Sequence, residues 1–192
     1  MPLVIKGSSS GQVTVDVPAA AGTNTLTFPA ATGNIITNKT AGTIIQIVNT
    51  QTGAVATGTT TMPQDDTIPQ NTEGDQYMTL AITPTNSSNK LKIDVVWHGS
   101  NGTASGIMLA ALFQDSTANA LAASSAGSTE AANDMKDIVF SHFMTAGTTS
   151  ETTFKVRAGF NASGTTTFNG AGSGRRLGGV FASSITITEI AV

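Results

Sequence analysis

The sequence KLKIDVVWH at residues 90–98 carries the clearest structural pattern in the chain. Its apolar side chains alternate with polar ones, which predicts a β-strand with one buried face. Val96 interrupts the polar series and indicates that part of the outer face meets another surface. Trp97, the single tryptophan, lies in the apolar series, so we expect it in the core and not as a stacking platform for sugar. The two series are Leu91, Ile93, Val95 and Trp97, and Lys92, Asp94 and His98.

Similar short runs recur along the chain, separated by turn residues, as is typical of an all-β protein. Residues 107–113 (IMLAALF) are continuously apolar, which favours a strand covered on both faces or lying at a subunit contact. Near the end, Glu189 shares a face with Ile185 and Ile187, so we expect a β-bulge or a rim position there. About ten short strands without a convincing helix predict a β-sandwich. Its main strands are expected at residues 44–49, 55–62, 77–83, 90–98, 107–113, 138–145, 152–159 and 184–192.

Two segments have weaker patterns. Residues 114–136 are dominated by Ala, Ser and Gly, and we interpret them mainly as a long loop that could hold a turn of helix at 129–135. Residues 161–179 are dense in Gly, Thr, Asn and Ser, and we expect an extended piece at 177–181.

The composition limits the classes of function. Of 192 residues only 11% are charged, the net charge is −3, and 39% are hydrophobic. The negative charge disfavours nucleic-acid binding, because such binding depends on phosphate contacts by basic residues. The chain has no cysteine, which excludes disulfides, thiolate zinc sites and cysteine nucleophiles. Residues 1–10 lack a secretory signal pattern and no apolar run is long enough to span a membrane, so we expect synthesis in the cytoplasm and no membrane insertion.

The N-terminal region has a different character. Residues 11–33 (GQVTVDVPAAAGTNTLTFPAATG) contain two short alternating pieces interrupted by prolines. So few apolar groups cannot form a stable unit alone, so this region must lie on another part of the chain or on another chain. We predict a β arm at residues 1–42 and a compact head at 43–192. The apolar positions expected to dock are Val13, Val15, Val17, Leu26 and Phe28.

The sequence offers little for catalysis or for metal binding. His98 and His142 lie in predicted strands, where two histidines could bind a metal but are more often half-buried polar residues. The loop with Asp65, Asp66, Glu73 and Asp75 does not have the spacing of a calcium loop, so we interpret it as solvated. We predict no catalytic residues, no metal and no cofactor.

Residues 170–176 (GAGSGRR) resemble a phosphate-binding loop only superficially. The Lys-Ser/Thr ending and the following helix are both missing from the pattern. The segment is predicted to be a flexible loop in which Arg175 and Arg176 could contact a receptor or a partner, such as an anionic sugar or a carboxylate.

Three stretches resemble known proteins. Residues 11–33 resemble an arm motif of bacteriophage tail-fibre and related virion proteins. Residues 176–192 (RLGGVFASSITITEIAV) look like the closing strand of the globular heads of such proteins, and the stretch from YMTLAITP at residue 77 to FQDS at residue 116 is similar to the same heads. Those heads resemble complement-type and tumour-necrosis-factor-like jelly rolls. The resemblance implies a ten-strand jelly-roll head that forms a homotrimer, with the arm intertwined among subunits or holding the virion.

These observations lead to one expected function and two alternatives. We expect a non-enzymatic structural protein on the surface of a phage particle, a tail-fibre-like knob that attaches to host surface glycans. The polar loops at residues 100–106, 118–133 and 161–176 would make that contact. The second hypothesis is a capsid decoration (cement) protein that stabilises the shell, and the third is a carbohydrate-binding module or a depolymerase. The low charge, the arm and the apolar surplus of residues 107–113 favour assembly with itself and with other virion proteins.

Overall fold

The alternating run at residues 90–98 forms the middle of a β-sheet in the computed structural model, which describes residues 3–6, 12–15 and 41–192. The chain divides into two units, Met1–Ile35 and Ile36–Val192. In the first unit, β1 (Leu3–Lys6) pairs antiparallel with β2 (Gln12–Val15). The sequence predicted an alternating piece that includes β2 and required it to lie on another part of the chain or on another chain, and the structure pairs it with β1. The roles of residues 1–42 as an attachment arm and of residues 43–192 as a head stay predictions.

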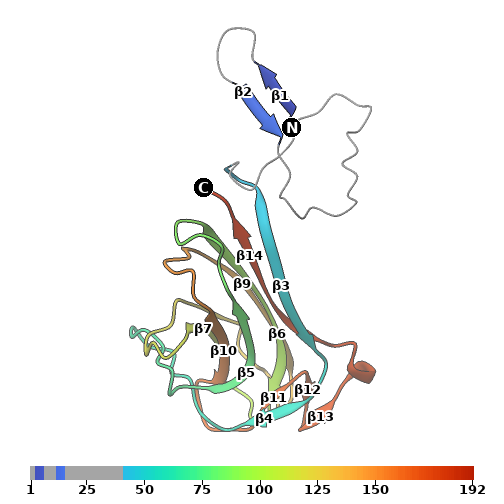
Figure 1. Cartoon of the computed structure of the whole chain (residues 1–192). Helices are drawn as coiled ribbons and strands as arrows, with labels where there is room; N and C mark the ends of the chain where they lie inside the picture. The colour runs from blue at the N-terminus through green and yellow to red at the C-terminus, as the bar shows by residue number, and fades with distance from the viewer. Residues whose placement is uncertain (1–2, 7–11, 16–40) are drawn as a thin grey trace. The chain divides into compact units, whose positions relative to one another are not determined.

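The second unit contains two large antiparallel sheets and a small two-stranded one (Figure 1). A four-stranded sheet has the order β5-β10-β7-β8. The other sheet has the order β3-β14-β6, with β9 also paired to β6, and its far part is extended by β11 and β4. The bounds are β3 (Ile44–Thr52), β4 (Ala56–Gly58), β5 (Asp75–Ile82), β6 (Lys90–Asn101), β7 (Met108–Gln114), β8 (Ala122–Ser125), β9 (Met135–Thr145), β10 (Thr152–Phe160), β11 (Thr166–Phe168) and β14 (Ser183–Ile190).

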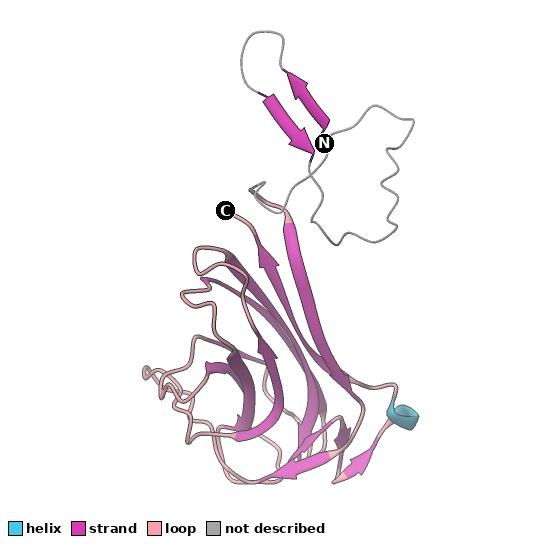
Figure 2. Ribbon diagram, viewed as in Figure 1, coloured by secondary structure: helices cyan, strands magenta, loops and turns pink. Residues whose placement is uncertain are grey.

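The strand order is that of a jelly roll. Along the chain, β3 lies in the larger sheet, β5 in the smaller, β6 in the larger, and β7 and β8 in the smaller. The chain then returns to the larger sheet at β9, to the smaller at β10, and ends in the larger at β14. This crossing between two packed sheets is the jelly-roll arrangement. No α-helix occurs within the described ranges (Figure 2), and the predicted fold class, an all-β jelly-roll sandwich, is confirmed.

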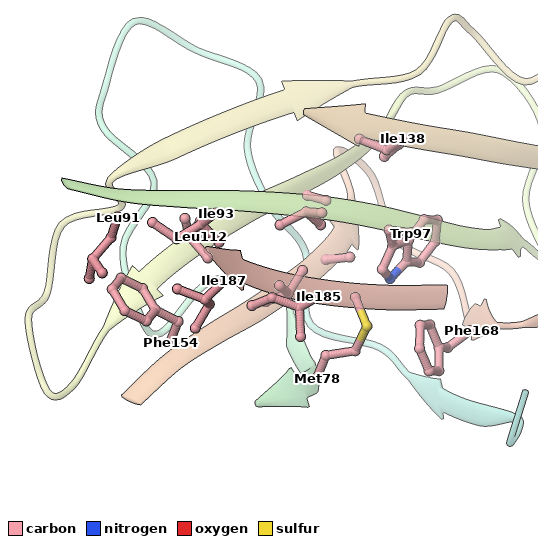
Figure 3. Close-up of a cluster of buried hydrophobic side chains, with 14 of the residues drawn as sticks. Met78, Leu91, Ile93, Trp97, Leu112, Ile138, Phe154, Phe168, Ile185 and Ile187 are labelled. Carbon is pink, nitrogen blue, oxygen red and sulfur yellow. The ribbon is translucent and has the colours of Figure 1, made fainter. Parts of the chain in front are cut away.

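The core lies between the inner faces of the two sheets (Figure 3). Trp97 is fully buried, as predicted, and contacts the rings of Tyr77 and Phe168, whose centroids lie 6.2 Å from its own. Burial of apolar area at about 25 cal/mol per Å² is the main force that holds two such sheets together. The centre of the core comprises Met78, Leu91, Ile93, Val95, Leu112, Phe154, Val156, Ile185 and Ile187.

A second, smaller core explains the continuously apolar strand β7. Leu109, Ala111 and Phe113 point away from the main core and are buried beneath Met62. The strand is therefore covered on both faces within a single chain. Residues 107–113 therefore hold no surplus apolar surface for assembly, contrary to the prediction, because the segment around Met62 already covers that surface.

Local differences from the sequence-based expectation occur in the less regular segments. Residues 114–136 contain the short strand β8 and no helical turn at 129–135, since Thr129 is buried and pairs its backbone with Gly106 and Ser105. The expected extended piece at 177–181 is instead a 3-10 turn, Leu177–Gly179. The bulge expected near Glu189 is confirmed by a shift in the β14–β3 register between Glu189 and Ile190.

Candidate interaction surfaces

The outer face of the larger sheet is the first candidate surface. Its side chains alternate with those of the core, so each strand presents every second residue outward. The middle of this face is polar: Lys92 and Asp94 form an ion pair at 2.7 Å, and the Ser141 hydroxyl donates to Asp94 at 2.5 Å. Burial alone would raise the pKa of Asp94, but the hydrogen bonds from Lys92 and Ser141 outweigh it and lower that pKa. Thr186 and Thr188 of β14 complete the polar strip.

An apolar patch lies at one edge of this face, on β9. Met135, Val139 and Phe143 occupy alternate outward positions, and their exposed fractions are 44%, 65% and 58%. Val96 of β6 lies directly opposite Val139 in the register, which accounts for the interruption seen in the sequence. Among the described strands β9 pairs only with β6, so it is an edge strand of eleven residues. A long edge strand with exposed apolar side chains is a typical site of association. We call these three residues the β9 patch.

A second apolar patch lies at the opposite edge, on β3. Ile44 and Ile47 are 56% and 57% exposed. Ile47 is opposite Thr188, and Ile44 is opposite Ile190, so both point to the same outer face as the β9 patch. We call these two residues the β3 patch. The outer face thus has an apolar patch at each edge and a polar strip between them.

The loops at the end of the sandwich away from the C-terminus (Figure 1), called the far end, form the second candidate surface. The sequence GAGSGRR makes a hairpin of β12 (Gly170–Ala171) and β13 (Gly174–Arg175), and Gly172 and Ser173 both have positive φ, as a tight two-residue hairpin turn requires. No phosphate-binding loop is formed. Arg175 and Arg176 are both exposed. The 3-10 turn Leu177–Gly179 follows and exposes Leu177. Val180, the residue after the turn, is 86% exposed, the highest value among the large apolar residues in the described part of the chain.

The predicted docking residues of the N-terminal region are only partly described. Val13 and Val15 belong to β2, whereas Val17, Leu26 and Phe28 lie outside the described residues. Their part in docking stays a prediction.

The two histidines do not form a metal site. His98 points outward from β6 and its Nδ1 lies 2.5 Å from Asp137. His142 has the opposite orientation in β9, because it alternates with the outward Ser141 and Phe143. Across residues 3–6, 12–15 and 41–192, no group of three or more His, Asp or Glu side chains is arranged to hold a metal.

The acidic loop uses its carboxylates locally. Asp65 accepts hydrogen bonds from the backbone and hydroxyl of Thr67, which lower its pKa, and Asp75 accepts two from Thr60. The loop lies beside β8 and encloses two adjoining shallow hollows of about 440 and 270 Å³. No aromatic side chain lines either one, and Trp97 is buried elsewhere, so neither hollow offers a stacking platform for sugar. Both hollows share Asp65, Thr67, Pro69 and Ala123.

The sequence did not single out the residues of either patch or the apolar residues of the far loop. One signal was present: residues 138–145 carry apolar side chains on both faces, with Ile138 and Phe140 on one and Val139 and Phe143 on the other.

No helix in the described part of the chain is long and apolar enough to cross a membrane.

No protein-family model matches the sequence, and no curated protein matches it. Among solved structures, Eiger TNF from S. frugiperda is 12% identical, with a TM-score of 0.39, and the match covers 76% of this chain and 93% of that chain. The infectious bursal disease virus VP2 subviral particle is 10% identical, with a TM-score of 0.34, covering 78% of this chain and 39% of that chain.

A third match is dimeric latent PorU from Porphyromonas gingivalis, which is 10% identical with a TM-score of 0.38, covering 79% of this chain and 14% of that chain. The chain therefore spans well under two thirds of the PorU and VP2 chains that it matches. Because all of these TM-scores lie below 0.5, the assignment of the jelly roll rests on the strand order described above.

Proposed function

We propose that this protein is a non-enzymatic structural subunit of a phage particle, which forms a homotrimer through the outer face of its larger sheet. The observation that carries the proposal is the pair of apolar patches at opposite edges of that face. Residues 1–42 would hold the particle, and the far loops with Arg175 and Arg176 would face the host, in the manner of a tail-fibre knob.

The positions of the patches favour a ring. If the β9 patch of one copy packs against the β3 patch of the next, each copy uses two different surfaces, and such contacts form a ring when the rotation between copies closes. The polar strip with Lys92 and Asp94 would separate the two contacts. A face-to-face twofold dimer would make the same contact twice, with each β9 patch on the partner's β3 patch, so the mass in solution is what distinguishes a trimer from a dimer.

Charge substitutions test this arrangement. We expect sedimentation of the intact protein at micromolar concentration to give three times the chain mass of 19.4 kDa. The single substitutions Val139→Lys and Ile47→Glu each place a charge in an apolar contact and should give monomers. The double variant should reassociate, because the lysine of one copy then faces the glutamate of the next.

The matched control is Ile68→Glu, since Ile68 is 54% exposed but lies outside both patches. It should remain a trimer. A monomeric wild-type protein would refute the proposal of self-assembly. Dissociated single variants without reassociation of the double variant would refute the pairing of β9 with β3.

Capsid decoration is the alternative that the same surfaces permit. The number of copies per particle separates the two, because dozens of trimers would mean decoration of the shell and six or fewer would mean a tail appendage. Deleting residues 1–42 should abolish incorporation and leave a folded head. Release of reducing sugar from host polysaccharide would overturn the non-enzymatic assignment.

A further inference from the structure

The far loop of the sandwich exposes apolar and cationic side chains together. Val180 is 86% exposed and Leu177 is 67% exposed, the two largest values among the exposed large apolar residues described. Arg175 and Arg176 directly precede them and are also exposed. We call these four residues the tip. In Figure 2 the short helical turn of the tip (cyan) stands out at the side of the sandwich, near the end that is away from the C-terminus.

The tip has a fixed backbone. Leu177, Gly178 and Gly179 have successive φ values of 49°, 64° and 94°, a left-handed run that disfavours a residue with a side chain such as Leu177. Two hydrogen bonds close the turn, from Gly179 N–H to Arg176 O and from Val180 N–H to Leu177 O, both at 3.2 Å.

Neighbouring segments support the turn from below. A Cβ atom on Gly53 would lie 1.8 Å from the carbonyl oxygen of Gly179, so the two backbones are in direct contact. The ring of Phe181 packs at a tilt on the ring of His98, with the two centroids 4.5 Å apart, and holds the return of the chain into β14. The tip therefore presents Leu177 and Val180 outward from a supported position.

The charge of the tip has no partner in the described chain. Neither arginine forms an ion pair within residues 3–6, 12–15 and 41–192, and Arg176 donates only to nearby backbone carbonyls. The described carboxylates that are ion-paired are Asp94, Asp134 and Asp137, and their partners are Lys92, Lys136 and His98. From residue 152 to residue 188 the sequence contains no Asp or Glu. The tip is thus an unneutralised cationic element with an apolar end.

We propose that the tip docks on an anionic lipid surface. Arginine guanidinium groups bind lipid phosphates, and Leu177 and Val180 would enter the boundary between headgroups and acyl chains. A polar glycan would account for the arginines but would leave both aliphatic side chains in water. The lack of a long apolar run predicts no membrane insertion, but a loop that reaches only the interface needs no such run. The biological setting of this inference rests on the proposed attachment function.

Vesicle binding tests the proposal on the intact protein. We expect co-sedimentation with vesicles of equal parts phosphatidylcholine and phosphatidylglycerol, and at least about tenfold weaker binding to phosphatidylcholine alone. Replacing Leu177 and Val180 together by Ser should weaken binding by on the order of tenfold or more, as should replacing Arg175 and Arg176 together by Ser. The control Ile68→Ser removes an aliphatic side chain that is 54% exposed and lies outside the tip, and it should bind like the wild type.

A probe of position gives a second measurement. Because the chain has no cysteine, Val180→Cys and Ile68→Cys each allow a single environment-sensitive dye to be attached. The dye at position 180 should shift to the blue on addition of anionic vesicles, and the dye at position 68 should not. Absence of wild-type binding to anionic vesicles would refute the proposal.

Two further outcomes would also contradict it. Binding that depends on the arginines but not on Leu177 and Val180, and that dextran sulfate reproduces, would identify a polyanion site instead. Binding that survives both paired substitutions would place the contact elsewhere. A trimer that does not bind vesicles would refute this inference alone, whereas a monomer that binds them through the tip would refute only the proposed assembly.

Discussion

Glu189 provides the sharpest test of the energetics of this fold. It is fully buried on β14, on the same face as Ile185 and Ile187, and it has no cationic partner among the described residues. Its carboxylate accepts hydrogen bonds from the Asn89 amide at 2.6 Å, from the backbone and hydroxyl of Thr85 at 2.8 Å, and from the Gln46 amide at 2.6 Å. These neutral donors hold the turn between β5 and β6 against the end of the larger sheet.

Removing the carboxylate should therefore be costly. Glu189→Ala leaves the buried Asn89 amide and the part-buried donors of Thr85 and Gln46 without their acceptor, and we expect a loss of about 3 to 5 kcal/mol from the free energy of unfolding. Glu189→Gln keeps the shape but puts an amide NH2 opposite that of Gln46. Gln46 cannot rotate its amide without losing its bond to the Thr83 carbonyl at 2.8 Å, so this variant should lose about 1 to 3 kcal/mol.

The loss should depend on pH. Burial alone would raise the pKa of Glu189, but the hydrogen bonds from Gln46, Asn89 and Thr85 outweigh burial and lower it. A carboxyl group with a lower pKa in the folded state stabilises the protein above its unfolded pKa of about 4.3, and this contribution disappears as the pH falls through the folded pKa. The stability difference between the wild type and Glu189→Gln should thus be full at neutral pH and shrink on acidification.

Urea denaturation followed by the fluorescence of Trp97 measures both effects at one fixed protein concentration. Glu151→Gln serves as the control, because Glu151 is exposed and should change the unfolding free energy by less than about 0.5 kcal/mol. A loss of less than about 1 kcal/mol for Glu189→Ala would refute the role assigned to these hydrogen bonds, because even one buried donor left without an acceptor should cost more than that. A difference between the wild type and Glu189→Gln that stays constant from neutral to acidic pH would refute the assigned pKa shift.

Three further substitutions test other parts of the head. Met62→Ala should open a cavity over Phe113 and cost about 2 to 5 kcal/mol in urea denaturation, and a cost below about 1 kcal/mol would mean that the small core is not formed. Asn169→Ala should cost about 3 kcal/mol by thermal denaturation, because Asn169 is fully buried, has φ of 54°, and forms four side-chain hydrogen bonds with residues 52, 54 and 183. Stability equal to the wild type would contradict those contacts. Gly53→Ala should displace the tip, since its Cβ would lie 1.8 Å from Gly179 O, and unchanged vesicle binding with unchanged stability would show that the contact is absent.

Period-two alternation made much of the head predictable. Strand β6 follows the pattern read from KLKIDVVWH, and Trp97 lies in the core for the same reason. Glu189 was recognisable because a carboxylate in an apolar series requires a local irregularity, and the register shift is found there. In such strands one side of the pattern faces the opposite sheet, so local sequence contains the needed information.

The remainder depends on contacts between distant residues. Met62 covers Phe113 across the outer surface of the smaller sheet, and neither residue indicates its partner locally. Leu177 has a left-handed backbone conformation that a residue other than glycine seldom adopts. The sequence therefore favoured an extended piece there. In residues 138–145 both series are apolar, and only the packing of β9 on β6 decides that Val139 and Phe143 face outward.

The completeness of the core bears directly on what the outward apolar residues do. Ile138 and Phe154 are buried with their neighbours between the sheets, and Met62 closes the other side of β7, so folding of the head does not require Ile47, Val139 or the tip. Exposed apolar side chains add little to the stability of a monomer and favour association. It follows that Val139→Lys and Ile47→Glu should each leave the unfolding free energy of the dissociated head within about 0.5 kcal/mol of the value for the dissociated wild-type head, while lowering the mass in solution at micromolar concentration. Assembly that fell only in proportion to lost stability would instead make these residues part of the fold.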